Sequence, residues 1–230
     1  MDIFHSPVPD VQNPLNRSYI GGAPTLPKDS AWPADTKTGE DLIFFFQIKL
    51  PEHHALGGKI VSVFSNINAY EADRIIPKLP HDLRATHLDH HFFKDYDSFF
   101  KFLIIDDVNL SLKTTSREYV EHHILEFGTC GEDKIRFGSG FDCPLWELDD
   151  EAPLTFEGDK LSVIFLFQTM IDYEFSVVAG APRQKKQNYE TGVGSVDSID
   201  ARYDLFASNA CYYFALGHSN NYNIYIVPQS

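Results

Sequence analysis

Cations, cysteines and long apolar runs are all scarce in this chain, and each shortage narrows what the chain can be. Its 230 residues hold 19 lysines and arginines against 33 aspartates and glutamates, a formal net charge of −14. Such a surface repels nucleic acid and anionic lipid, so we expect neither as a partner. The same potential attracts a basic protein and speeds its approach. Plain solubility is the simpler use of this charge.

The cysteines and the N-terminus bear on the compartment. An odd count of three cysteines, Cys130, Cys143 and Cys211, without CxxC spacing predicts neither a disulfide framework nor a structural zinc site. Residues 1–10 carry no basic region and no apolar stretch of signal length. The longest apolar runs, Leu42–Phe46 and Val163–Phe167, are too short to cross a bilayer. We therefore expect a cytoplasmic protein with reduced thiols.

What the chain does have is aromatic side chains and turn residues. Hydrophobic residues make up 43% of it, with 19 Phe and 11 Tyr, alongside 14 Gly and 13 Pro. This composition supplies a sizeable core and favours strands joined by turns. The length fits one compact domain over residues 1–230.

One short motif occurs twice. Residues 43–47 read IFFFQ and residues 164–168 read IFLFQ, each preceded by a glycine and an acid. Both faces of each run are apolar, as in a central strand covered on both sides. We interpret this as a degenerate internal duplication, with halves near 1–137 and 138–230, and with two central strands in one sheet or in two joined sheets. Buried Gln47 and Gln168 must satisfy their amides, so we expect them to bind backbone where the halves meet.

The remaining segments complete the predicted α+β fold, a mainly antiparallel sheet with few short helices. Residues 59–66 predict a second strand, and two alternating runs around Gly217–Asn221 predict a hairpin. A short helix is expected over 69–76. The best helical pattern lies in residues 115–128, with Ser116 as its cap and Gly128 as its stop. The apolar residues in 94–110 fit neither the spacing of a helix nor the alternation of a strand.

The N-terminal stretch has features of its own. Residues 1–41 contain too many prolines for a long helix, yet they include Tyr19 and Trp32, so we expect them to pack across the core. Gly21 and Gly22 would permit a tight turn or a close backbone approach.

The same region carries a recognisable pattern. Residues 19–50 read Gly-Gly-x-Pro-x-Leu-Pro, then Trp-Pro, then Asp-Leu and an apolar run ending Gln-Ile-x-Leu. This pattern resembles the YwqG-like bacterial family, a domain of unknown function, and "VIFLFQT" at 163–169 resembles its second glutamine-containing strand. Residues 137–148, "FGSGFDCPLWEL", depart from the family pattern. The resemblance implies a duplicated, mainly antiparallel fold without established catalytic residues. Members are often encoded near polymorphic toxins, which implies an immunity role for some of them.

Several residues invite a catalytic or metal-binding interpretation. His81, His87, His90 and His91 cluster with Asp82 and Asp89, and His87 and His91 would share one face of a helix. The adjacent pairs His53–His54 and His122–His123 diverge and chelate poorly. Cys130 lacks a fixed base, and Ser139 lacks the glycine spacing of a nucleophile elbow. Solvated polar positions explain these residues better, so we expect no metal, no cofactor and no catalytic residue.

The densest acidic stretch gives the functional hypothesis. No lysine or arginine occurs between Phe137 and Asp159, and the acids there include Asp142, Glu147, Asp149, Asp150 and Glu151. We interpret them as a docking surface for a basic toxin domain, with Trp146 as an aromatic anchor or, equally, a core indole. The chain would then be a non-enzymatic immunity protein. The alternatives are a hydrolase with a His and carboxylate site, or a regulatory binder of a small ligand between the halves. The sequence leaves the oligomeric state open.

Overall fold

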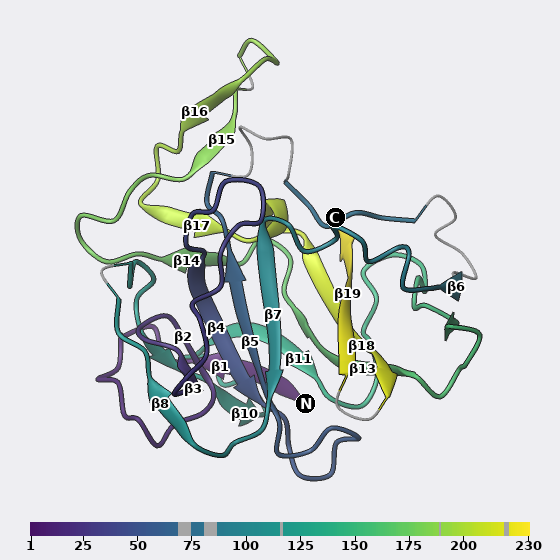
Figure 1. Cartoon of the computed structure of the whole chain (residues 1–230). Helices are drawn as coiled ribbons and strands as arrows, with labels where there is room; N and C mark the ends of the chain where they lie inside the picture. The colour runs from purple at the N-terminus through teal and green to yellow at the C-terminus, as the bar shows by residue number, and fades with distance from the viewer. Residues whose placement is uncertain (69–74, 81–86, 116, 189, 219–220) are drawn as a thin grey trace.

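The computed structural model describes residues 1–68, 75–80, 87–115, 117–188, 190–218 and 221–230 (Figure 1). Strands make up 41% of the chain and helix 1%. This confirms a mainly antiparallel sheet fold with few short helices. The helix described is the 3₁₀ turn η2, Phe206–Ser208. Within the described residues, no helix has the length and apolar character needed to cross a membrane.

Two large sheets form the body of the molecule. The six-stranded sheet has the order β10 (Glu126–Gly128), β1 (Asp2–His5), β11 (Ile135–Gly140), β13 (Val163–Thr169), β18 (Ala210–His218), β19 (Asn221–Gln229). The five-stranded sheet has the order β7 (Phe100–Ile105), β5 (Ile60–Ser65), β4 (Ile43–Lys49), β2 (Tyr19–Ile20), β9 (His123–Ile124).

Two-stranded ribbons decorate these sheets. They pair β3 (Thr25–Pro27) with β8 (Leu110–Leu112), β6 (His87–Leu88) with β12 (Thr155–Phe156), β14 (Glu174–Ser176) with β17 (Arg202–Asp204), and β15 (Lys185–Gln187) with β16 (Ser195–Asp197). The β6–β12 pair is parallel and the others are antiparallel. β15 and β16 project from the top of the molecule in Figure 1.

The repeated motif occupies an interior strand of each sheet. The orders β2-β4-β5-β7 and β11-β13-β18-β19 correspond strand for strand. In β4 the register shifts between Phe44 and Phe46, and in β13 between Phe165 and Phe167, so the irregularity falls at the same place in both motifs. The duplication inferred from IFFFQ and IFLFQ therefore extends to four strands and a shared bulge.

The first half lends strands to the sheet of the second half. β1 precedes β2 in the chain but pairs with β11, in the sheet of the second half. β9 precedes β11 but pairs with β2, in the sheet of the first half. β11 itself spans the expected boundary between residues 137 and 138. β1 and β10 thus lie in the sheet of the second half although their residues belong to the first half, and this ties the two sheets into one unit.

The core between the sheets is aromatic. Phe46 of β4 lies edge-on to Phe137 of β11, with ring centroids 4.9 Å apart, and also contacts Phe167 of β13 at 6.0 Å. Edge-to-face geometry is favourable for such pairs. A smaller cluster covers the outer face of the five-stranded sheet, where Trp32 packs on Phe64 at 5.5 Å. The expectation that residues 1–41 pack on the core is confirmed.

The helix predicted over residues 115–128 is wrong. That segment supplies a bridge at Val120 and the strands β9 and β10. β9 and β10 form backbone hydrogen bonds with β2 and β1. Pairing with these distant strands outweighs the helical spacing of the apolar residues in this segment. Ser116 lies outside the described residues.

The other predicted elements fared differently. Residues 69–74 of the second expected helix lie outside the described part. The C-terminal hairpin is confirmed as β18 and β19, and the predicted strand over 59–66 is β5. The stretch 94–110 contains β7.

The glycines after β2 allow a close backbone approach, as expected. Gly21 has φ +60°, and a Cβ there would lie 2.2 Å from the Glu121 carbonyl oxygen. The Gly22 N–H donates to the Val120 carbonyl at 3.1 Å. Only glycine fits the first position, where the N-terminal segment crosses the chain that leads into β9.

Candidate functional site

Buried glutamines fasten loops to the sheets through both ends of their amides. Gln47 Oε1 accepts the Thr25 N–H at 2.9 Å, and its Nε2 donates to the Arg17 carbonyl at 3.1 Å. Gln168 Oε1 accepts the Leu145 N–H at 2.6 Å, and its Nε2 donates to the Leu145 carbonyl at 3.0 Å. The predicted backbone-binding role of both motif glutamines is confirmed, but their predicted place where the halves meet is wrong, because each glutamine binds backbone of its own half.

The acidic segment, residues 142–151, is held rigidly by these contacts. Tyr212 donates to the Leu145 carbonyl at 3.0 Å and accepts the Glu147 N–H at 2.7 Å. Gln229 accepts the Leu148 N–H at 3.1 Å and donates to the Asp149 carbonyl at 2.8 Å. Because sheet side chains fix its backbone, the segment is preorganised for binding.

The acid side chains of this segment face solvent. Asp142, Glu147, Asp149 and Asp150 are exposed, and Glu151 is half-buried, accepting from Gln229 at 3.2 Å. Within the described residues, no ion pair joins Asp142, Glu147, Asp150 or Glu151 to a cation. The segment therefore presents negative charge that the fold leaves largely uncompensated.

Apolar side chains lie exposed among these acids. Leu145 is 55% exposed and Leu148 is 63% exposed. Leu154, just beyond the segment, is 45% exposed. Trp146 is half-buried, and its ring packs on Tyr212 with centroids 4.3 Å apart. The indole thus holds the segment to β18, while the leucines offer the apolar contact surface.

The histidines singled out in the sequence do not converge. His87 Nδ1 lies 2.8 Å from the Thr155 hydroxyl, and His90 is exposed, 3.8 Å from Glu157. His54 uses both ring nitrogens on backbone, at Phe165 and Leu56. No set of three or more His, Cys, Asp or Glu residues suited to a metal ion exists in the described ranges. His81 and Asp82 lie outside them.

A buried histidine cluster was missed by sequence reasoning. His5 and His123 lie with ring centroids 4.6 Å apart, beside a cavity of about 360 Å³. Both Nδ1 atoms lie against the Ser6 carbonyl, at 2.6 and 3.2 Å, so each must carry the proton there. The Tyr173 hydroxyl lies 2.7 Å from His5 Nε2.

Burial sets the protonation of His5 and Tyr173. It lowers the pKa of His5 and raises that of Tyr173, so a neutral imidazole accepts from a protonated phenol. The nearest carboxylate to His123, that of Glu121, is 3.9 Å from Nε2, beyond hydrogen-bond distance. The histidines lie where β1 of the six-stranded sheet and β9 of the five-stranded sheet approach each other. Residues 118 positions apart in sequence give no local signal of this contact.

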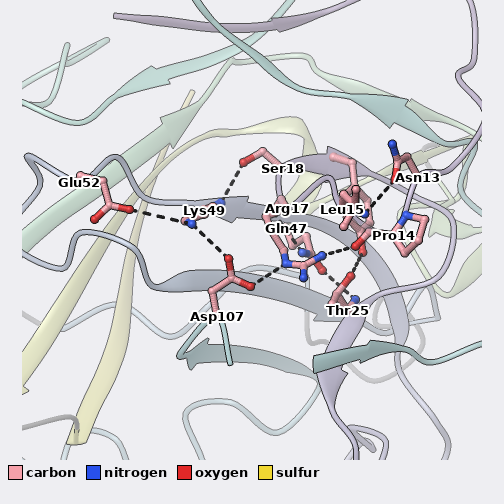
Figure 2. A network of polar contacts seen from close by, with 11 residues as sticks. Asn13, Pro14, Leu15, Arg17, Ser18, Thr25, Gln47, Lys49, Glu52 and Asp107 are labelled. Atoms are coloured by element: carbon pink, nitrogen blue, oxygen red, sulfur yellow. Dashed lines mark hydrogen bonds and ion pairs between the residues drawn. The ribbon is translucent and has the colours of Figure 1, made fainter. Parts of the chain in front are cut away.

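A second polar network surrounds Asp107 (Figure 2). Asp107 binds Arg17 at 2.7 Å and Lys49 at 3.1 Å, beside an open cavity of about 490 Å³. Burial alone would raise the pKa of Asp107, but the hydrogen bonds from both cations outweigh it and lower that pKa. Asp106 instead pairs with Lys59 at 2.6 Å. The network ties residues 13–18 to the end of β4.

Comparison of the chain with family models, curated proteins and solved structures finds no match. The resemblance to the YwqG-like family therefore stays a prediction.

Proposed function

We propose that this chain is a cytoplasmic binding protein that neutralises a basic toxin domain by docking it on the acidic segment. The observation that carries the proposal is a backbone fixed by six hydrogen bonds, which presents exposed leucines and the acids Asp142, Glu147 and Asp150, none of which forms an ion pair within the described residues. The acids would steer a basic partner inward, and the leucines would slow its release. Immunity is the form of this function that the family resemblance favours.

The direct test uses the protein encoded by the reading frame adjacent to this gene. Glu147→Lys/Asp150→Lys reverses two exposed acids of the segment. At about 50 mM salt we expect its association rate to fall about tenfold, because electrostatic steering is lost. Surface plasmon resonance measures the rate, and raising the salt to about 500 mM should remove most of the difference.

A matched variant separates the segment from overall charge. Asp29→Lys/Glu40→Lys makes the same change in net charge at exposed positions after β3, outside the acidic segment. Its association rate should stay within about twofold of wild type. Equal losses in both double variants would refute docking at the segment, and absence of any complex would refute the toxin proposal.

A further inference from the structure

The two corresponding edge strands, β7 and β19, face a common recess. β7 ends the five-stranded sheet and β19 ends the six-stranded sheet. Between them lies a cavity of about 210 Å³ whose lining includes Phe100, Phe102, Tyr222 and Ile224. We call this recess the edge groove. It lies apart from the acidic segment, which packs on β13, β18 and the C-terminal end of β19.

Hydrogen bonds fix which backbone groups of β19 point into the edge groove. The Ile226 N–H donates to the Tyr96 hydroxyl at 3.0 Å, so it points away from β18. Backbone groups alternate in direction along an antiparallel strand, so those of Tyr222 and Ile224 point the same way. Pro228, at the next such position, has no N–H to leave unpaired.

The same reasoning applies to β7. The Phe99 carbonyl accepts the Asn66 N–H at 2.9 Å, so Phe99 faces the β5 side. Phe100, Phe102 and Ile104 therefore direct their backbone groups away from β5. β7 pairs with β5 and β19 with β18, and within the described residues no other hydrogen bond reaches these outward groups of Phe100, Phe102, Tyr222 or Ile224.

Tyr96 already takes the place of one strand residue. Its ring contacts Phe100 at 5.5 Å and Tyr225 at 6.3 Å, and its hydroxyl accepts from the backbone of β19. Burial raises the pKa of this phenol well above its usual value, so it stays neutral. The side chain thus satisfies Ile226 as a strand carbonyl would and closes one end of the edge groove.

We propose that the edge groove binds a short extended peptide segment of a partner protein by strand addition. The outward groups of Tyr222 and Ile224 span about 7 Å, which matches roughly three residues of added strand. The lining of the edge groove is mixed: the rings of Phe93, Phe102 and Tyr222 are apolar, while polar groups, among them the ion pair of Asp97 with Lys101, make up most of the surface. The occupant is therefore an uncharged, alternately apolar strand.

A single strand suits the recess better than a second copy of this chain. An edge strand of another molecule carries its own sheet beside it, and the two walls of the edge groove would exclude that sheet. A peptide with two free edges can bond to β7 and β19 together. Self-association is therefore an outcome that the test must distinguish.

The probe is a capped heptapeptide of alternating valine and threonine with serine at both ends, and its N-methylated analogue is the control. Fluorescence polarisation should show saturable binding of the first peptide only. Amide exchange measured by NMR should slow at Tyr222 and Ile224, while the inward-facing Asn223 changes little. Binding of both peptides alike, or no saturable binding, would overturn the proposal. Slower exchange of these amides at higher protein concentration in the absence of peptide would indicate self-association and would also overturn the proposal.

A variant pair isolates the backbone donor. Tyr222→Pro removes an outward N–H, as Pro228 does naturally, whereas Tyr222→Ala removes the same ring and keeps the N–H. We expect the Pro variant to bind about tenfold more weakly than the Ala variant. Equal affinities would contradict strand addition. If circular dichroism shows that the Pro variant does not fold, the amide-exchange measurement on the wild-type protein with peptide tests the proposal instead. Glu147→Lys/Asp150→Lys should bind the peptide normally, which separates this proposal from toxin docking.

Discussion

Replacing Gln47 by leucine should destabilise the protein far more than most single substitutions of similar size. The change removes two hydrogen bonds, each with a net value of about 1 kcal/mol. It also leaves the N–H of Thr25, a residue that is 1% exposed, without a hydrogen-bond partner, at a further cost of about 1–3 kcal/mol. Added apolar burial offsets part of this. We expect a loss of about 2–4 kcal/mol in the free energy of unfolding.

The equivalent change in the second motif should cost less. Gln168→Leu releases Leu145, which is 55% exposed, so water can replace the lost partners. The Leu145 carbonyl also keeps its bond from Tyr212. We expect about 1–2 kcal/mol here, and about 0.5 kcal/mol or less for Gln187→Leu on an exposed position of β15.

Urea unfolding followed by fluorescence measures all three variants, and the dependence on urea should be unchanged if each alters only the folded state. The order Gln47, Gln168, Gln187 is the result that matters. If Gln47→Leu were as mild as Gln187→Leu, the motif glutamine would not fasten residues 17–25 to β4, and the account of the first half would fail.

Three further variants, two of them paired with a control variant, test other parts of the fold. Burial lowers the pKa of His5 from its ordinary value of 6.5. The stability that neutral His5 contributes is therefore complete above pH 6.5 and is lost as the pH falls toward the lower pKa of the folded state. Thermal unfolding at about pH 7.5 and pH 5.5 should show lower stability at the lower pH, and this difference should be smaller in His5→Phe. Asp107→Asn should lower the free energy of unfolding, measured with urea, by about 1–2 kcal/mol because it removes the ion pairs of Arg17 and Lys49. Asp106→Asn, at a side chain that is 62% exposed, should lower it by about 0.5 kcal/mol or less. Gly21→Ala should cost more than about 3 kcal/mol or prevent soluble expression, and Gly39→Ala, with φ +73° but open space around it, about 1 kcal/mol; equal costs would contradict the close approach.

The sequence predicted best what is encoded within a short window. The apolar runs ending in Gln47 and Gln168 are strands, because a motif apolar on both faces must be covered on both faces. The role of the glutamines followed from the need to satisfy buried amides. The C-terminal hairpin was equally local.

Contacts between distant segments were beyond that reasoning. Residues 115–128 have a stripe that fits a helix, yet β9 and β10 form because β2 and β1 offer unpaired edges. β1 pairs in the six-stranded sheet and β9 in the five-stranded sheet, and the approach of these two strands creates the histidine cluster. No feature of the sequence near His5 or His123 identifies the other histidine as its neighbour. The exposed leucines beside the acids were readable in the sequence, but the side chains that fix that segment come from β13, β18 and β19.

The most direct test of the central claim is hydrogen exchange on the complex with the product of the adjacent reading frame. The account predicts that binding slows exchange over residues 142–154 and leaves the segment after β3 unchanged. Protection elsewhere, with residues 142–154 exchanging at the rate of the free protein, would contradict the assignment of the acidic segment as the docking surface.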